Sequence, residues 1–550
     1  MRNVLCVLCL ILLACGKEDD PSKKEPPVEE FLISRSVMIN GISGGLNYSN
    51  INTNPRIEVL FSLPVDKESA LTAVNMNNSA NATTAIQLIY ENNDSTIVIK
   101  PINPLSEFSK YTITVSTALK TKNGTSLALP VTVNLTTSID STYKYPVISD
   151  EELLTLVQRQ TFKYFWDFGH PVSGMARERS TSGNTVTTGG TGFGIMAMIV
   201  AVERGFITRN DAVGRIQKIT TFLKDKCTSY HGVFAHWVNG ETGETQPFSA
   251  KDNGADLVET SFLFQGLLTA RQYFSGSETA ETKLRNDIND LWEAVEWDWF
   301  RRDGQNVLYW HWSPDFGWDM NHKIRGWNEC LITYVLAAAS PTHSIPDVVY
   351  NDGWARGGEM KNDGTYHGNK LPLGEAYGGP LFFAHYSFLG LNPKGLSDKY
   401  ADYWEQNTNH SLINYKHCIN NPSKYSLYSA DCWGLTASDG DKGYSAHSPT
   451  NDRGVITPTA ALSSMPYIPE ESLKALHFFY YIMGDRLWKE YGFVDAFNPT
   501  TNWYDNQFLA IDQGPIIIMI ENHRTGLLWD LFMNCPEVQT GISKLGIQSN

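Results

Sequence analysis

Three acidic residues with helical spacing form the densest group of reactive side chains in the sequence. Asp252, Asp256 and Glu259 are four and then three positions apart, so on a helix their carboxyl groups would share one face. The apolar residues that follow predict a buried helix, and burial of like charges raises the pKa of at least one carboxyl, as a general acid requires. Stabilisation of a helix N-terminus could account for Asp252 and Asp256, but not for Glu259.

Two isolated carboxyl groups are further candidates. Glu329 follows Trp327 at the start of an apolar helical segment, where loss of water favours the neutral acid; the alternative is a buried ion pair with Arg325. Asp439 precedes a glycine, which suits either a presented carboxylate or an ordinary Asp-Gly turn. Cleavage of a glycosidic bond needs a protonated carboxyl to donate to the leaving oxygen and usually an ionised one to activate water or attack carbon. Asp252, Asp256, Glu259, Glu329 and Asp439 therefore form the predicted catalytic set.

Aromatic side chains accompany these carboxyl groups. A sugar ring has an apolar face that packs on flat aromatic rings and a polar rim that binds carboxylates, amides and arginine. Residues 308–318 (LYWHWSPDFGW) concentrate such side chains, and their Pro and Gly content predicts a loop. Some of these rings should fill gaps between helices, while at least two should face a sugar. The candidate substrate-binding residues are Arg177, Trp237, Tyr309, Trp310, His311, Trp312, Trp318, Trp327, Trp433 and Glu521, although a structural ion pair with Arg524 is the favoured alternative for Glu521.

Charge and motif content exclude several other functions. The formal net charge of -15 argues against binding to nucleic acid, to an anionic membrane surface or to a polyanionic substrate, so we expect a neutral ligand. The sequence has no HExxH, GxSxG, P-loop or strand-linked GxGxxG motif, and its histidines lack ligand spacing. We therefore expect neither a cofactor nor a metal. Most cysteines should be buried free thiols, although Cys418 and Cys432 could form a disulfide.

The N-terminal residues have the pattern of an export signal. A positive charge at Arg2 precedes a short apolar run, which ends in the lipobox-like sequence LLAC at Cys15. We expect a signal peptide over 1–15, lipidation of Cys15 and a flexible tether over 16–30. The alternative is a plain secretory peptide. The acidic residues after Cys15 resemble the export tag of surface lipoproteins in Bacteroides-type bacteria, which implies a lipid anchor in the outer membrane, at the cell surface or the periplasmic face. We also expect a monomer.

The remaining chain predicts two domains of different class. Residues 31–140 contain roughly seven short alternating segments separated by turn formers, which is typical of an Ig-like β-sandwich. Residues 145–550 hold all 15 Trp residues and show helical periodicity. The predicted helices alternate with Gly-rich and aromatic loops, which favours an (α/α)6 barrel. Their expected ranges are 151–168, 191–204, 209–228, 254–275, 281–297, 325–340, 381–390, 397–420, 456–464, 468–486, 507–522 and 526–535.

Several segments in order resemble one family. These are 174–180 (GMARERS), 188–194 (TGGTGFG), 236–243 (HWVNGETG), 252–259, 309–318, 326–329 (GWNE), 378–385 (GGPLFFAH), 433–440 (WGLTASDG), 512–515 (DQGP) and Glu521 with Asn522. Together they resemble the glycoamylase-like domain of glycoside hydrolase family 144 over about 151–532.

The resemblance implies hydrolysis of β-1,2-glucan or its oligosaccharides, with inversion at the anomeric carbon, on an (α/α)6 barrel. It implies functional roles for the same five carboxyl groups. We favour Glu329 as the proton donor, and either the cluster of Asp252, Asp256 and Glu259 or Asp439 as the group that orients and activates water. Release of sophorose in an exo mode is one expectation. The alternatives are a non-catalytic surface glycan-binding lipoprotein and a hydrolase of another glucan linkage.

Overall fold

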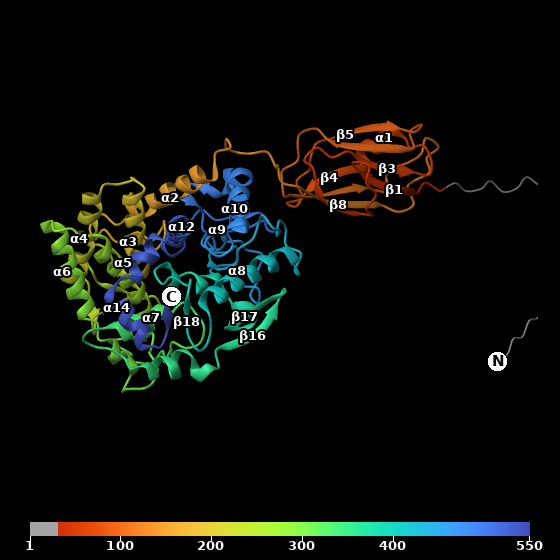
Figure 1. Cartoon of the computed structure of the whole chain (residues 1–550). Helices are drawn as coiled ribbons and strands as arrows, with labels where there is room; N and C mark the ends of the chain where they lie inside the picture. The colour runs from red at the N-terminus through yellow and green to blue at the C-terminus, as the bar shows by residue number, and fades with distance from the viewer. Residues whose placement is uncertain (1–30, 550) are drawn as a thin grey trace, which may run out of the picture. The chain divides into compact units, whose positions relative to one another are not determined.

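The computed structural model describes residues 31–549, which form two compact units that divide between Ile139 and Asp140 (Figure 1). The predicted signal peptide over 1–15, the lipidation site Cys15 and the tether over 16–30 lie outside the described residues. Among the described residues, no helix has the length and apolar character needed to cross a membrane.

The N-terminal unit is a β-sandwich of two four-stranded sheets, which confirms the expected Ig-like architecture. One sheet has the order β1-β3-β6-β5 and the other β2-β8-β7-β4, and all neighbours are antiparallel except β2 and β8. Alternate residues of β3 and β8 are buried, as the two-residue periodicity predicts. The strands are β1 (Ser34–Ile39), β2 (Asn47–Ile51), β3 (Ile57–Phe61), β4 (Val74–Asn78), β5 (Ile86–Glu91), β6 (Thr96–Pro101), β7 (Lys110–Val115) and β8 (Val131–Thr137), with helix α1 (Lys67–Ala73) after β3.

The C-terminal unit is helical, and successive helices alternate between two degrees of burial. The first class buries one side and exposes the other, as amphipathic sequences do: α2 (Asp150–Trp166), α4 (Arg209–Asp225), α6 (Thr279–Glu293), α8 (Tyr403–Asn420) and α10 (Pro469–His477). The second class is buried almost throughout: α3 (Thr188–Glu203), α5 (Leu257–Tyr273), α7 (Leu331–Ala339), α9 (Pro458–Leu462) and α12 (Ala510–Arg524). Helix α3 packs against α5 and α12, so the buried helices form an inner layer.

Short elements complete this unit. Helices α11 (Gly484–Leu487), α13 (Leu527–Met533) and α14 (Pro536–Lys544) lie between and after the longer ones. A hairpin, β16 (Lys361–Tyr366) with β17 (Asn369–Leu373), is larger than the other strand pairs of this unit. Those other strands are β9 (Thr185–Thr187), β10 (Ser229–Tyr230), β11 (Val233–Phe234), β12 (Trp237–Asn239), β13 (Thr245–Gln246), β14 (Ala255–Asp256), β15 (His311–Trp312), β18 (Leu396–Ser397), β19 (Ala437–Ser438), β20 (Ser445–Ala446), β21 (Trp488–Lys489), β22 (Gly492–Phe493), β23 (Phe497–Asn498), β24 (Trp503–Tyr504) and β25 (Gln548–Ser549).

Three predicted helices differ from the observed elements. The segment over 325–340 becomes helical only at Leu331, since Gly326 has a left-handed backbone with φ of 80°. The segment over 381–390 forms two 3-10 turns, Leu381–Ala384 and Ser387–Leu389. The segment over 468–486 is divided by a π-helical turn at Phe478–Ile482. Helix α2 begins with a capping box, in which the side chain of Ser149 accepts from the backbone N–H of Glu152 and Glu152 accepts from that of Ser149.

Close backbone contact joins α3 to α5. A Cβ atom placed on Gly192 would lie 2.1 Å from the carbonyl oxygen of Phe262, and one on Gly266 would lie 2.2 Å from the carbonyl oxygen of Gly192. The two helices can approach this closely only because both positions lack a side chain. This contact fixes the distance between the N-terminal turns of α3 and α5, where the candidate site begins.

Candidate active site

A cavity of about 360 Å³ opens at the N-terminal ends of the inner helices. Thr187 precedes α3, Glu259 lies in the first turn of α5, and Glu329 lies just before α7. The first turns of the inner helices and the loops before them therefore bring the chemically active residues together, while the rest of each helix stays apolar. The lining residues are Glu178, Arg179, Thr187, His236, Trp237, Phe248, Glu259, Phe262, Trp310, Glu329, Phe382, Tyr386, Ala437, Tyr444, Leu509 and Ile511.

The Asp252, Asp256 and Glu259 cluster is real, but its geometry differs from the expected helix face. Helix α5 begins at Leu257, so Asp252 lies in the preceding loop. Asp256 is the N-cap, and its Oδ1 accepts hydrogen bonds from the backbone N–H groups of Val258 (3.0 Å) and Glu259 (2.9 Å). A turn, and not the helical repeat, brings the three buried carboxyl groups together.

Two histidines contact this cluster, but only one of them carries a positive charge near pH 7. His236 Nδ1 lies 3.0 Å from Asp256 Oδ2, and its Nε2 lies 3.9 Å from Glu259 Oε1. Burial lowers the pKa of His236, but the charges on Glu259 and Asp256 outweigh it and raise the pKa to about 9. His311 Nε2 lies 3.4 Å from Asp252 and 3.6 Å from Asp256. Burial lowers the pKa of His311 to about 4, so His236 is the imidazolium and His311 is neutral near pH 7.

The carboxyl groups of the cluster respond differently to this environment. Burial and the neighbouring Asp256 raise the pKa of Asp252 to about 7. Burial also raises the pKa of Asp256, but the hydrogen bond from His236 and nearby positive charge reverse the effect, so its pKa lies below the ordinary value. Asp256 is therefore the ionised member that pairs with His236.

Glu259 is the member of this cluster that lines the cavity. Its Oε2 accepts hydrogen bonds from the backbone N–H of Gly189 (2.8 Å) and the hydroxyl of Thr187 (3.3 Å). Burial nonetheless raises its pKa above the ordinary value. These two donors, at the start of α3, fix Oε2 of Glu259, while Oε1 lies toward His236.

Glu329 is buried at 9% exposure and lines the same cavity as Glu259. Burial raises its pKa to about 7, and the charges of Glu259 and Asp256 act in the same direction. Among the described residues Glu329 has no ion-pair partner, so the alternative of a pair with Arg325 is not what the structure shows. A carboxyl that is protonated near neutral pH and open to a cavity can donate a proton.

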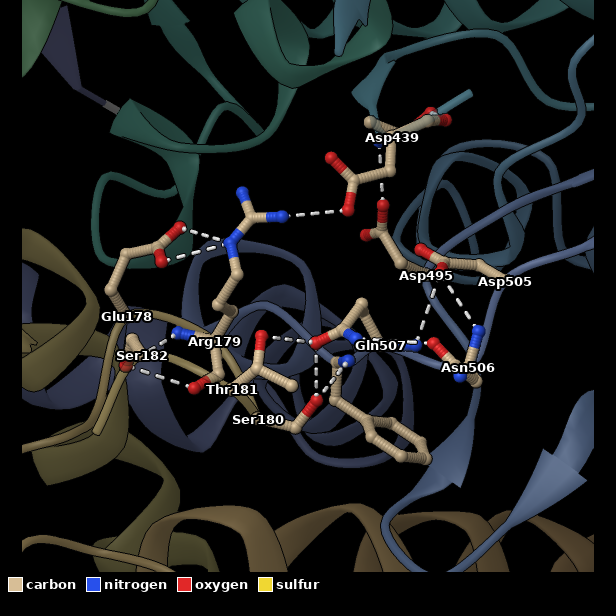
Figure 2. A network of polar contacts seen from close by, with 12 residues as sticks. Glu178, Arg179, Ser180, Thr181, Ser182, Asp439, Asp495, Asp505, Asn506 and Gln507 are labelled. Carbon is tan, nitrogen blue, oxygen red and sulfur yellow. Dashed lines mark hydrogen bonds and ion pairs between the residues drawn. The ribbon is translucent and has the colours of Figure 1, made fainter. Parts of the chain in front are cut away.

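Asp439 belongs to a second polar network at the cavity edge (Figure 2). Its Oδ2 accepts a hydrogen bond from Arg179 Nη1 at 2.7 Å, while Arg179 Nε pairs with Glu178 at 2.9 Å. The backbone N–H of Asp439 donates to Asp495 Oδ2 at 2.8 Å. The side chain of Asp439 is thus held by the guanidinium of Arg179, and its main chain by the carboxyl group of Asp495.

Two sets of oxygen and nitrogen atoms come close enough to hold a cation. His236, Asp252 and Asp256 each place one ligand atom within 4.8 Å of the others, as do Asp439, Asp495 and Asp505. In the first set the imidazolium of His236 already supplies positive charge. In the second set Arg179 does so for Asp439.

The predicted aromatic residues divide between the cavity and the core. Trp237 and Trp310 line the cavity. Tyr309, Trp327 and Trp433 are buried among other side chains, so their predicted contact with a sugar is not what the structure favours. Tyr309 donates to Gln305, Trp327 stacks near Tyr403, and Trp433 donates to the carbonyl of Glu471.

Three other candidates lie close to the cavity without lining it. His311 is behind Asp252 and Asp256 and stacks near Trp310. Trp312 and Trp318 both pack against Trp299, which holds them in an aromatic cluster beside the loop.

Arg177 and Glu521 have structural partners instead of the predicted role in substrate binding. Arg177 donates to the carbonyls of Phe168 and Gly183, both at 2.8 Å. Glu521 is buried and makes a two-pronged ion pair with Arg204, with both distances 2.8 Å. The expected partner Arg524 instead binds Glu151 and Gln158.

Sequence reasoning missed several lining residues. Arg179 lies in the same motif as Arg177, and residue type alone does not distinguish a guanidinium that binds carbonyls from one that binds a carboxylate. His236 begins a motif rich in polar and aromatic residues, but that motif does not predict its contact with Asp256. The remaining missed residues are Glu178, Thr187, Phe248, Phe262, Phe382, Tyr386, Ala437, Tyr444, Leu509 and Ile511.

Comparison with known proteins places these observations in a family. Residues 321–536 match the family model "Glycoamylase", described as "Putative glucoamylase", and residues 39–137 match a bacterial Ig-like domain. A curated relative from Parabacteroides distasonis, an exo β-1,2-glucooligosaccharide sophorohydrolase (non-reducing end), is 48% identical over 423 residues, or 73% of this chain. The chain spans 58% of the length of that relative.

Two solved structures are also similar. An endo-β-1,2-glucanase from Chitinophaga pinensis, in complex with sophorotriose and glucose, is 54% identical, covers 73% of this chain and 99% of its own, and has a TM-score of 0.72. A β-1,2-glucanase from Parabacteroides distasonis is 38% identical, covers 94% of this chain and 72% of its own, and has a TM-score of 0.71. At this identity and coverage, the chain belongs to the glycoamylase-like family whose members include these β-1,2-glucan-active proteins.

Proposed function

We propose that this protein is an inverting glycoside hydrolase of family 144 that cleaves β-1,2-glucosidic bonds in β-1,2-glucan or its oligosaccharides. The activities for which its relatives are named support this substrate class. The alternation of half-buried and fully buried helices supports an (α/α)6 barrel as the scaffold.

The observation that carries the proposal is Glu329. It is a buried carboxyl whose pKa is raised to about 7, and it faces a cavity that Glu259 and several aromatic rings also line. A sugar held against Trp237 and Trp310 would present its glycosidic oxygen to a protonated acid. A merely sugar-binding protein has no need for a carboxyl kept neutral by burial.

Hydrolysis with inversion needs one group that donates a proton and another that activates water. Glu329 donates its proton to the glycosidic oxygen as the bond to the anomeric carbon breaks. Asp439, held in place by Arg179, accepts a proton from a water that attacks the anomeric carbon from the opposite face. The products are a new reducing end of inverted configuration and a free hydroxyl on the leaving sugar. Glu259 and His236, which line the cavity, bind hydroxyl groups of the sugar, and the charges of Glu259 and Asp256 help to raise the pKa of Glu329.

The place and mode of action are part of the proposal. The relative from Parabacteroides distasonis is named as an exo-acting sophorohydrolase, which supports release of sophorose. The LLAC sequence supports lipidation of Cys15 and attachment of a monomer to the outer membrane.

Glu329→Gln tests the assignment. Loss of the donated proton should lower kcat by roughly 10²- to 10⁴-fold on β-1,2-glucooligosaccharides while the protein stays folded. Glu296→Gln is the control, since Glu296 pairs with His231 and does not line the cavity. Full activity of Glu329→Gln would refute the role of Glu329.

Product analysis tests the reaction itself. Proton NMR during early turnover should show the α-anomer first, as inversion of a β-linkage requires. Laminarin, cellulose and starch serve as comparison substrates. Appearance of the β-anomer first would contradict inversion. Binding of β-1,2-glucan without release of reducing ends would favour a non-catalytic glycan-binding protein, and faster cleavage of a comparison substrate would favour another linkage.

A further inference from the structure

Two buried carboxyl groups lie side by side behind Asp439. Asp495 and Asp512 are each only 2% exposed, and their carboxyl groups are within hydrogen-bond reach of each other. Asp495 Oδ1 and both carboxyl oxygens of Asp512 have no other hydrogen-bond partner in the part of the chain that the structure describes. Asp495 Oδ2 accepts the backbone N–H of Asp439 at 2.8 Å (Figure 2).

The surroundings do not supply enough positive charge for two carboxylates. Asp439 and Asp505 add negative charge beside Asp495, and Arg179, which faces this group, is already bound to Asp439 and Glu178. The remaining titratable neighbours of Asp512 are Tyr386 and Tyr444, which supply no positive charge. Two ionised carboxylates in contact without water or a cation are strongly unfavourable.

We propose that Asp495 and Asp512 share a single proton, and that this pair positions Asp439 by accepting its backbone N–H. The inference rests on the proposed function, because it concerns the carboxylate assigned to water activation. The shared proton lies between Asp495 Oδ1 and Asp512, so that Asp495 Oδ2 stays free to accept from Asp439. Burial raises the pKa of both groups, that of Asp512 to about 7, which is consistent with one proton held near neutral pH. Arg179 then fixes the side chain of Asp439 while Asp495 fixes its main chain.

The pair can be tested by amide and alanine substitutions. In Asp495→Asn the amide N–H₂ replaces the shared proton and the amide oxygen still accepts from Asp439, so kcat should stay within about fivefold of wild type. Asp512→Asn should behave similarly, because its amide can donate to Asp495. Asp495→Ala leaves the N–H of Asp439 unpaired, so kcat should fall roughly 10- to 100-fold with KM nearly unchanged. Equal damage from Asp495→Asn and Asp495→Ala would overturn the proposal, as would an Asp495→Ala variant with wild-type kcat.

Infrared spectroscopy separates this inference from the enzymatic assignment. In a Glu329→Gln background, infrared difference spectra should contain a C=O band of a protonated aspartic acid that disappears in Asp495→Asn, whereas the band of Asp252, whose pKa is also raised to about 7, should remain. Absence of the band that Asp495→Asn removes would refute the shared proton even if the enzyme is active. A rise in Tm on addition of CaCl₂, lost in Asp495→Asn, would show that a cation occupies the pair in place of the proton. If the band is present but β-1,2-glucan is not cleaved, the shared proton stands while the assigned activity, and with it the positioning role, fails.

Discussion

Replacement of Gly189 by alanine isolates one contact of the candidate site. Gly189 lies in the first turn of α3, and its N–H donates to Glu259 Oε2 at 2.8 Å. A Cβ atom at this position would lie 2.6 Å from that same oxygen, which is too close for any real contact. The end of the Glu259 side chain can rotate more easily than the backbone can move, so the carboxylate should swing away while α3 and α5 keep their places.

The magnitude follows from the hydrogen bond that is lost. A hydrogen bond to a charged group contributes about 1.5–3 kcal/mol. If this bond holds Glu259 in the geometry needed for turnover, kcat/KM should fall roughly 10- to 150-fold, since each 1.36 kcal/mol corresponds to tenfold. Alanine is the better helix former, so the free energy of unfolding should change much less than the activity does.

The assay compares two glycine variants. Initial rates on β-1,2-glucooligosaccharides and thermal unfolding are measured for Gly189→Ala and for Gly214→Ala. Gly214 is an exposed residue of α4 with no atom within 4 Å of an added Cβ, so Gly214→Ala should keep full activity and gain about 0.5–1 kcal/mol of stability. Wild-type activity in Gly189→Ala would refute the reasoning that Glu259 must be held by α3. If Gly189→Ala lowered the free energy of unfolding by as much as it raised the activation free energy, the helices, and not the carboxylate, would have moved.

Three further outcomes are expected. Arg204→Ala should lower the free energy of unfolding by about 3–5 kcal/mol because it leaves Glu521 buried without its cation, while an unchanged KM would exclude Glu521 from substrate binding. Phe248→Ala should raise KM roughly 2- to 10-fold at unchanged Tm, because this ring is 49% exposed and lines the cavity; Phe316→Ala, at 43% exposure and away from the cavity, should leave KM unchanged. The pKa of Glu329 is about 7 in the folded protein and 4.5 as its ordinary value. Between these two pH values the folded state binds more protons than the unfolded state, so this group should lower wild-type stability as pH rises. Chemical denaturation should therefore find Glu329→Gln more stable than wild type by about 3 kcal/mol at pH 8 and similar to it at pH 4; an equal difference at both pH values would contradict the shifted pKa.

The sequence predicted best those helices that are specified by their own caps and amphipathic repeat. Helices α2 and α4 match their expected ranges within a few residues because each has a side-chain cap and an amphipathic repeat. The segment over 381–390 is apolar enough for a helix, yet it forms two 3-10 turns. Its apolar composition reports burial and does not distinguish a helix from a buried turn.

The candidate site was predictable in its carboxyl groups but not in their partners. Glu259 and Glu329 stand out because acids in apolar surroundings are rare, and both line one cavity. The contacts of His236 with Asp256 and of Arg179 with Asp439 join residues 20 and 260 positions apart. No local spacing encodes such contacts. The aromatic loop over 308–318 was likewise recognisable, but only tertiary packing decides that Trp310 lines the cavity while Tyr309 is buried.

The glycine contact between α3 and α5 has a consequence for how this protein can change. Gly192 and Gly266 let the two backbones touch, and Gly189 and Glu259 lie about one to two turns away along the same helices. A larger residue at either contact would act as a wedge that separates a donor from its acceptor without touching either. Random mutagenesis should therefore recover inactive variants at positions remote from the sugar, and a smaller residue on the opposite helix should not restore them, because the added atom meets backbone oxygens.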